Sequence, residues 1–156
     1  MGGGVLMGKT VLVGGVFDVI HPGHIELLKR AKSLAGEGGR LVVLVARDST
    51  VEESRGRPPI IPEEARRFIV ENLKPVDEAI LGFQPPSIEG VLATVKPDIV
   101  VLGYDQDYLR ETLEKAIKRL GIRVEIVKMG KFEGYMPNSS SLIKQRIVEY
   151  FMERGV

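Results

Sequence analysis

The chain has 156 residues, of which 44% are hydrophobic and 28% are charged, and its formal net charge is +1. A chain of this length and composition is typical of one globular domain. The small net charge argues against binding to nucleic acid or to an anionic membrane, and no apolar run reaches the about 20 residues that a bilayer requires. The absence of cysteine excludes disulfides and thiolate metal sites, and it is consistent with a cytoplasmic protein.

The distribution of apolar residues predicts where strands and helices lie along the chain. Short apolar runs without polar alternation are typical of strands that are covered on both faces. Such runs predict strands over residues 10–16, 41–46, 77–81, 98–102 and 122–127. Apolar residues at helical spacing, with proline or glycine near the ends, predict helices over residues 22–35, 62–73, 87–95, 107–120 and 138–151.

The remaining stretches are predicted to be irregular. The glycine-rich beginning predicts a flexible tail over residues 1–8, followed by a single domain over residues 9–156. Residues 47–61 are predicted to form a polar loop, and residues 128–137 an irregular, mobile stretch. Alternating strands and helices favour parallel strands joined by crossover helices. The predicted fold class is therefore α/β, with a single Rossmann-like, doubly wound sheet of five parallel strands and helices on both faces.

The connection after the first strand carries the strongest chemical signal. Gly14 and Gly15 let a ligand approach the backbone at the carboxyl end of a strand, where open parallel sheets bind their ligands. Pro22 suits the first turn of the next helix, whose free N–H groups and dipole favour a phosphate. His21 and His24 are three residues apart, so both can donate hydrogen bonds to phosphoryl oxygens from one face of that turn.

Two other interpretations of this histidine pair stay open at the level of the sequence. One ring can cap the helix while the other is an ordinary surface group. The pair can also bind a metal ion, although no third ligand is evident beside it. Phosphoryl transfer fits the pattern best, because that reaction requires charge stabilisation and positioning more than a nucleophilic side chain.

Polar and basic groups follow the second strand. Asp48 either caps the loop or helps to position an acceptor or a metal ion. Arg55 and Arg57 flank a glycine, which suits a mobile loop that binds phosphate through two guanidinium groups. A basic loop that contacts only solvent fits the same residues equally well. This segment is therefore a second candidate for contact with phosphate.

Two further segments place polar groups at strand ends or helix starts. Gly103, Asp105 and Gln106 follow the fourth strand, where they can bond a base or a ribose, or begin the next helix as caps. The serines at positions 139–141 open the last helix, and a helix start with free hydroxyls binds phosphate well. A cap accounts for one serine and leaves the other two available to a ligand.

Residues 15–24, with the sequence GVFDVIHPGH, resemble the G-T-F-D-x-x-H-x-G-H signature of the cytidylyltransferase-like nucleotidyltransferases. Val16 stands where that family usually has threonine. The resemblance implies that His21 and His24 are catalytic and stabilise the α-phosphate, and it places Val16 and Phe17 at the nucleotide. It also implies that Asp18 lies near the acceptor phosphate or its bound metal.

The same resemblance extends in order over residues 9–151 and assigns further roles. The serines at 139–141, followed by Leu-Ile-Lys, resemble the family's second signature, I-S-T-[ST]-x-I-[KR], which implies contacts to the β- and γ-phosphates. Lys128 and Lys131 are candidates for the basic residue that usually precedes that signature. Arg57 and Arg66 are implied to be catalytic, with Arg66 facing the active site and Arg67 facing solvent. Asp18, Asp48 and Arg55 are implied to lie on the acceptor side.

Within that superfamily, residues 45–51, 55–59, 74–77 and 102–107 resemble the archaeal-type FAD synthases most closely. That resemblance implies transfer of AMP from ATP to FMN by a homodimer, with Mg²⁺ held mostly by phosphate oxygens and water. Glycerol-3-phosphate with CTP, phosphopantetheine with ATP, and a nucleotide-binding module without catalysis are the alternatives. The flavin ring requires an apolar slot, for which five aromatic side chains are candidates, namely those of Phe17, Phe83, Phe132, Tyr104 and Tyr135. For the phenylalanines, packing in the core is the favoured alternative.

Overall fold

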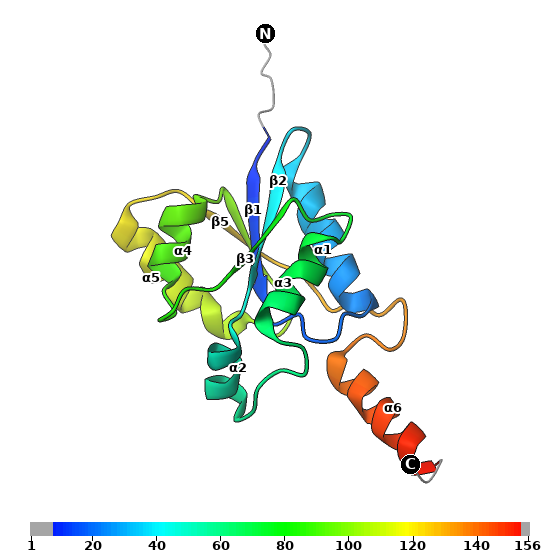
Figure 1. Ribbon diagram of the computed structural model, residues 1–156. Helices are drawn as coiled ribbons and strands as arrows, with labels where there is room; N and C mark the ends of the chain where they lie inside the picture. The colour runs from blue at the N-terminus through cyan, green and yellow to red at the C-terminus, as the bar shows by residue number, and fades with distance from the viewer. Residues whose placement is uncertain (1–7, 154–156) are drawn as a thin grey trace.

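A computed structural model describes residues 8–153 and shows a single five-stranded sheet (Figure 1). The strands are β1 (Thr10–Gly15), β2 (Arg40–Val45), β3 (Glu78–Leu81), β4 (Ile99–Leu102) and β5 (Glu125–Lys128). All neighbours are parallel, in the order β3-β2-β1-β4-β5. The chain therefore winds outward in both directions from β1, and the point where it reverses lies between β1 and β4.

Helices cover both faces of this sheet. They are α1 (Pro22–Ala35), α2 (Asp48–Arg55), α3 (Glu63–Glu71), α4 (Ile88–Val95), α5 (Arg110–Leu120) and α6 (Ser140–Glu153), with a 3-10 turn over Asp107–Leu109. α1 and α3 pack on one face, and α4 and α5 pack on the other (Figure 1). The predicted doubly wound α/β fold is confirmed. α6 extends away from the sheet, and none of its residues is buried.

The core consists of two hydrophobic clusters, one on each face of the sheet. Successive strand residues point to opposite faces, so Val11 and Val13 of β1 belong to the cluster under α1 and α3. Leu12, which lies between them, belongs to the cluster under α4 and α5. Both faces are covered, which explains why the strands have apolar runs without polar alternation.

The predicted loop over residues 47–61 is wrong in its first half, because α2 occupies Asp48–Arg55. Only Val51 of this helix is buried, so its sequence lacks the apolar stripe that indicates a helix. Residues 129–139 contain no helix or strand, as predicted for residues 128–137. The predicted tail lies, apart from Gly8, outside the described residues. Between residues 8 and 153, no helix is both long enough and apolar enough to cross a membrane.

Candidate active site

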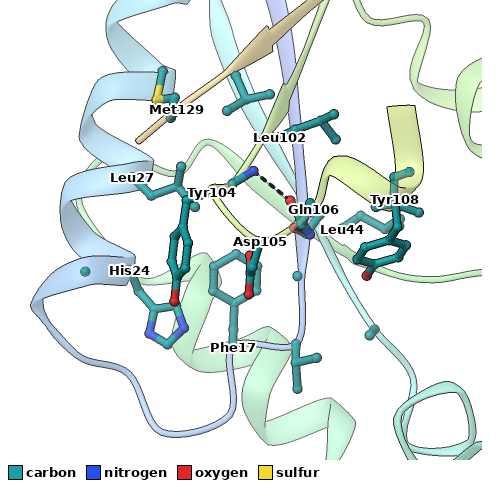
Figure 2. A pocket seen from close by; sticks show the side chains of 18 of the residues that line it. Phe17, His24, Leu27, Leu44, Leu102, Tyr104, Asp105, Gln106, Tyr108 and Met129 are labelled. Carbon is teal, nitrogen blue, oxygen red and sulfur yellow. Dashed lines mark hydrogen bonds between the residues drawn. The ribbon is translucent and has the colours of Figure 1, made fainter. Parts of the chain in front are cut away.

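A cavity of about 680 Å³ lies at the carboxyl ends of β1, β2 and β4. The first turn of α1, the loop after β4 and the start of α6 contribute to its lining. Figure 2 shows its interior, with His24 and Tyr104 on the side of α1, and Leu44 and Tyr108 on the opposite side. The cavity therefore lies at the reversal point of the sheet, where doubly wound folds bind their ligands.

The two histidines of the first signature are held together by the start of α1. The Nδ1 of His21 accepts a hydrogen bond from the Gly23 N–H at 3.0 Å, and the Nδ1 of His24 accepts one from the His21 N–H at 3.2 Å. The ring centroids are 3.7 Å apart. Because each Nδ1 accepts, the proton of each neutral ring is on Nε2. Both residues line the cavity, so each has one N–H donor left for a ligand.

Burial keeps both rings neutral. It lowers the pKa of His21, and it lowers the pKa of His24 to about 3, to which the neighbouring His21 also contributes. The ring of Phe17 packs beside His24, with centroids 5.3 Å apart. The site therefore presents two uncharged N–H donors at neutral pH. Both rings cap the start of α1, and their contact with a ligand stays a prediction.

Two glycines of the signature are required by packing around these rings. A Cβ at Gly15 would lie 2.8 Å from the Phe17 ring, and a Cβ at Gly23 would lie 2.8 Å from Cε1 of His21. Such distances are far below ordinary contact. Phe17 itself has a positive φ of 53°, a strained conformation for a bulky residue. The turn is thus held by its surroundings in a shape that its own residues disfavour.

The lowered pKa of His24 predicts a loss of stability in mild acid. The unfolded chain protonates this side chain below pH 6.5, whereas the folded chain does so only near pH 3. The unfolded state therefore binds more protons, and the free energy of unfolding falls by up to about 1.4 kcal/mol per pH unit as the pH drops below 6.5. Urea unfolding at pH 7 and pH 5 measures this loss. The His24→Asn variant is expected to lose less, and equal losses would contradict the assignment.

Asp18 is buried and ties three segments together. Its Oδ2 and Oδ1 accept hydrogen bonds from the N–H groups of Ile60 and Ile61, each at 2.9 Å, and Lys144 of α6 lies 3.1 Å from Oδ2. Burial opposes ionisation, but these three donors lower the pKa of the carboxyl group below its ordinary value. Lys144 is not among the predicted site residues, although it ends the second signature and is recognisable there.

Loss of this carboxylate is expected to release the loop between α2 and α3. In Asp18→Asn, the loop that begins at Gly56, directly after the last residue of α2, loses its charge-assisted anchors, so trypsin should cleave after Arg55 several times faster. Mass spectrometry of timed digests measures the rate. Asp77→Asn is the matched control, because Asp77 also accepts from a lysine and a backbone N–H but lies elsewhere. Equal cleavage in both variants would show that Asp18 does not hold the loop.

The structure places Arg66 differently from the prediction that it faces the active site. Its side chain is fully buried and does not line the cavity. The guanidinium donates to the carbonyl oxygens of Ile61 and Val16 at 2.8 and 2.7 Å, and to the Asp48 carboxylate at 2.6 Å. Arg66 therefore stabilises the connection between β1 and α1 through its bond to Val16, without lining the cavity. Asp48, at the start of α2, is its counter-ion. Arg67 lies at the surface, paired with two glutamates of its own helix.

The basic loop contributes one of its two arginines to the cavity. Arg55 ends α2 and lines the cavity, whereas Arg57 is exposed and outside its lining. Gly56 between them has φ of 77°, the left-handed conformation that ends the helix.

The loop after β4 lines the cavity with Gly103, Tyr104, Asp105 and Gln106. Both ends of the Gln106 amide are occupied: Oε1 accepts from the Gly103 N–H at 2.9 Å, and Nε2 donates to the Gly14 carbonyl oxygen at 3.0 Å. Gln106 thus joins β4 to β1. The predicted contact of this loop with a base or a ribose stays a prediction. Asp105 is exposed and reaches the cavity (Figure 2).

The two candidate lysines before α6 have different positions. Lys131 lines the cavity, and its ammonium lies 5.5 Å from the centroid of the Tyr104 ring. Lys128 pairs with Asp107 at 2.5 Å and is not part of the lining. Of these two lysines, Lys131 is therefore the one available to a ligand.

The start of α6 closes the cavity on the side of α1. Ser139 accepts a hydrogen bond from the Leu142 N–H and is the predicted cap. Ser140, which was predicted to be available to a ligand, instead donates its hydroxyl to the Val19 carbonyl oxygen. All three serines line the cavity. Asn138 is buried beside them, and among the described residues its Oδ1 is the one buried side-chain polar atom without a hydrogen-bond partner.

A metal ion would find few protein ligands here. The residues that the structure describes contain no group of three or more histidine, cysteine, aspartate or glutamate side chains able to bind one. Asp18, the carboxylate that the sequence resemblance brings near a metal, is occupied by three donors. A cation in this cavity would therefore depend on oxygen atoms of the substrate.

Comparisons with known proteins agree with this geometry. Residues 12–146 match the cytidylyltransferase-like family. The FAD synthase of Methanopyrus kandleri is 48% identical over 149 residues, covering 96% of this chain and 97% of the relative, and that of Korarchaeum cryptofilum is 47% identical, covering 93% and 95%. A solved structure, described as the lipopolysaccharide core biosynthesis protein from Thermoplasma volcanium, is 43% identical, with a TM-score of 0.74 over 81% of this chain and 99% of that one.

Proposed function

Because the chain belongs to the cytidylyltransferase-like family of nucleotidyltransferases, we propose that it is an FAD synthase, which transfers AMP from ATP to FMN. The observation that carries the reaction type is the pair of neutral Nε2–H donors of His21 and His24 in the cavity. The choice of ATP and FMN is supported by the names of relatives that are 43–48% identical over most of the chain.

The proposed reaction requires no covalent intermediate. A phosphate oxygen of FMN attacks the α-phosphorus of ATP in line and forms a P–O bond. The bond from that phosphorus to the oxygen bridging toward the β-phosphate breaks, and pyrophosphate leaves with the electron pair. A monoester phosphate is already ionised at neutral pH, so the attacking group needs no general base. His21 and His24 donate to the α-phosphate oxygens, where negative charge develops.

The nucleotide is proposed to lie on the side of the cavity formed by α1 and α6. The N–H groups at the start of α6 and the hydroxyl of Ser141 offer donors to the β- and γ-phosphates. Lys131 adds a positive charge on the same side. The unpaired Oδ1 of Asn138 is an acceptor that fits an amino or hydroxyl donor of the nucleoside.

A divalent cation such as Mg²⁺ is part of the proposal as a companion of the triphosphate. It would neutralise charge on the phosphate oxygens, which together with water would be its main ligands. The chain's own residues bind and orient the substrates around it.

The proposal is tested by supplying Mg²⁺ with each pairing of nucleotide and acceptor and measuring pyrophosphate. Turnover is expected with ATP and FMN, and chromatography should identify FAD. Turnover with CTP and glycerol-3-phosphate, or with ATP and phosphopantetheine, in place of ATP and FMN would identify a different transferase. Tight ATP binding without turnover in any pairing would indicate a binding module.

A further inference from the structure

The last helix, α6, has an apolar side that the rest of the described chain does not cover. Its beginning contacts the body of the protein through Ser140 and Lys144, and the helix then extends away from the sheet (Figure 1). Every residue from 145 to 153 is exposed. Four apolar side chains in this segment are between 46% and 75% exposed, namely those of Ile147, Val148, Phe151 and Met152.

These four side chains form one stripe along the helix, which we call the α6 stripe. Ile147 and Phe151 are four residues apart, as are Val148 and Met152, so each pair lies on one face and one turn apart. At about 3.6 residues per turn, the four occupy less than half of the circumference, and the glutamates and glutamine of the segment lie on the other side. This is the pattern of an amphipathic helix that packs on a partner.

The charges of α6 do not stabilise it as an isolated helix. Lys144 and Arg146 lie in its N-terminal half, and Glu149 and Glu153 lie in its C-terminal half. The helix dipole favours the reverse arrangement, with acidic groups at the start and basic groups at the end. A helix of 14 residues is also only marginally stable in water by itself. The α6 stripe therefore requires a packing partner from outside the described chain.

The order of the charges fits a second copy of α6 that runs antiparallel to the first. Arg146 and Glu153 are seven residues apart, so they lie on the same flank, two turns from each other. Among the residues that the structure describes, neither has an ion-pair partner. A two-fold axis near Glu149 would place Arg146 of each copy beside Glu153 of the other, and Ile147 opposite Phe151. A parallel pair would bring like charges together.

We propose that the α6 stripe pairs antiparallel with the α6 stripe of a second copy, and that this pairing holds the start of α6 at the cavity. In this arrangement, the last turn of each α6 lies beside the turn that carries Lys144 in the other copy. Lys144 pairs with Asp18, and the serines before it line the cavity, so the phosphate-binding end is supported from outside. The interface goes beyond the proposed function, and only its link to the nucleotide rests on that function.

Exchanging two charges tests both the occupant and its orientation. Arg146→Glu alone and Glu153→Arg alone should each raise the Kd of self-association about tenfold or more, because each variant meets like charges in its own copy. An equimolar mixture of the two variants should associate as tightly as wild type, since each then meets opposite charges. The double variant should also associate like wild type. Sedimentation velocity over a concentration series measures these constants.

The apolar contact and the link to the cavity are tested by Phe151→Glu. This variant should raise the Kd of self-association about 30-fold or more. Its Kd for ATP, measured by calorimetry, should rise several-fold, and the mixture of charge variants should recover the wild-type Kd for ATP. That recovery separates loss of pairing from a direct effect of a substitution. Phe68→Glu is the matched control, because Phe68 is a phenylalanine of α3 that is 62% exposed, and it should leave both constants unchanged.

The outcomes separate the interface from the function. Wild type that stays monomeric at every concentration would overturn the pairing, and its binding to phosphatidylserine vesicles would assign the stripe to a membrane. Loss of self-association in Phe68→Glu and not in Phe151→Glu would place the interface on α3 and overturn the proposal. Pairing without any effect on the Kd for ATP would overturn the link to the cavity. If wild type binds no ATP, the proposed function fails, while sedimentation still decides the pairing.

Discussion

Replacing His24 by alanine is expected to lower kcat about 10²–10³-fold, which is the usual loss when one hydrogen-bond donor to a developing oxyanion is removed. The affinity for ATP should change only a few-fold, because the interaction strengthens in the transition state and contributes little to the ground state. Steady-state kinetics with ATP and FMN, together with ATP binding by calorimetry, measure the two effects separately. Equal loss of binding and of kcat would contradict the catalytic role.

The structure supplies a control for the capping role of the same ring. His24 accepts a hydrogen bond from the His21 N–H through Nδ1, so alanine removes both a cap and a donor. The amide oxygen of asparagine can replace the Nδ1 acceptor, but asparagine has no group at the position of Nε2. His24→Asn should therefore keep more of the stability that His24→Ala loses, while kcat falls as far. Recovery of kcat in His24→Asn would assign the histidine to the cap alone.

Arg66→Met is expected to lower the free energy of unfolding by about 3–5 kcal/mol, because the fully buried guanidinium is removed from three acceptors, and a buried acceptor left without its donor costs about 1–3 kcal/mol. Three acceptors lose their donor at once: the carbonyl oxygens of Val16 and Ile61 and the Asp48 carboxylate. Because Val16 lies in the connection between β1 and α1, the histidines should also lose part of their positioning. Urea unfolding measures the loss of stability, and kcat measures the loss of positioning.

The adjacent arginine provides the matched control. Arg67 is at the surface and pairs with Glu64 and Glu71 of its own helix, so Arg67→Met should change the free energy of unfolding by about 1 kcal/mol or less. Arg66→Lys should recover little, because one ammonium cannot reach three acceptors arranged around a planar guanidinium. Wild-type stability with a strongly reduced kcat in Arg66→Met would restore the catalytic role that the sequence implied.

The sequence predicts the elements whose signals are local. α1 begins at Pro22 and ends at Ala35, as predicted, because proline suits its first turn and Gly36 follows its last residue. The strands are apolar because both faces of the sheet are buried, so runs of apolar residues in the sequence show where the strands lie.

The structure of α2 depends on contacts that the local sequence does not reveal. The carboxylate of Glu63, at the start of α3, accepts from the Asp48 N–H at 2.8 Å and from Arg47 at 3.0 Å. Asp48 in turn accepts from the Glu63 N–H at 3.3 Å. This exchange holds the start of α2 against α3, whereas α2 itself buries only Val51. A helix held by its neighbour cannot be read from its own residue pattern.

For the site, the sequence predicts which segments meet but not where each side chain points. The signatures bring His21, His24 and the three serines to one cavity, as predicted. Arg66 and Gln106 instead use their polar groups to join segments of the protein. A sequence motif shows which residues lie near the site. The direction in which each side chain points depends on the hydrogen-bond partners that the fold places around it.

The reciprocal caps of His21 and His24 also restrict the movement of protons. Each Nδ1 is committed to a backbone N–H, and each neutral ring has a single proton, on Nε2. A neutral imidazole releases that proton only far above physiological pH. It can accept a second proton only on Nδ1, and Nδ1 would then lose the hydrogen bond that it accepts from a backbone N–H. The pair is therefore unsuited to act as a proton shuttle, and the chemical step of the proposed reaction should proceed at nearly the same rate in D₂O as in H₂O.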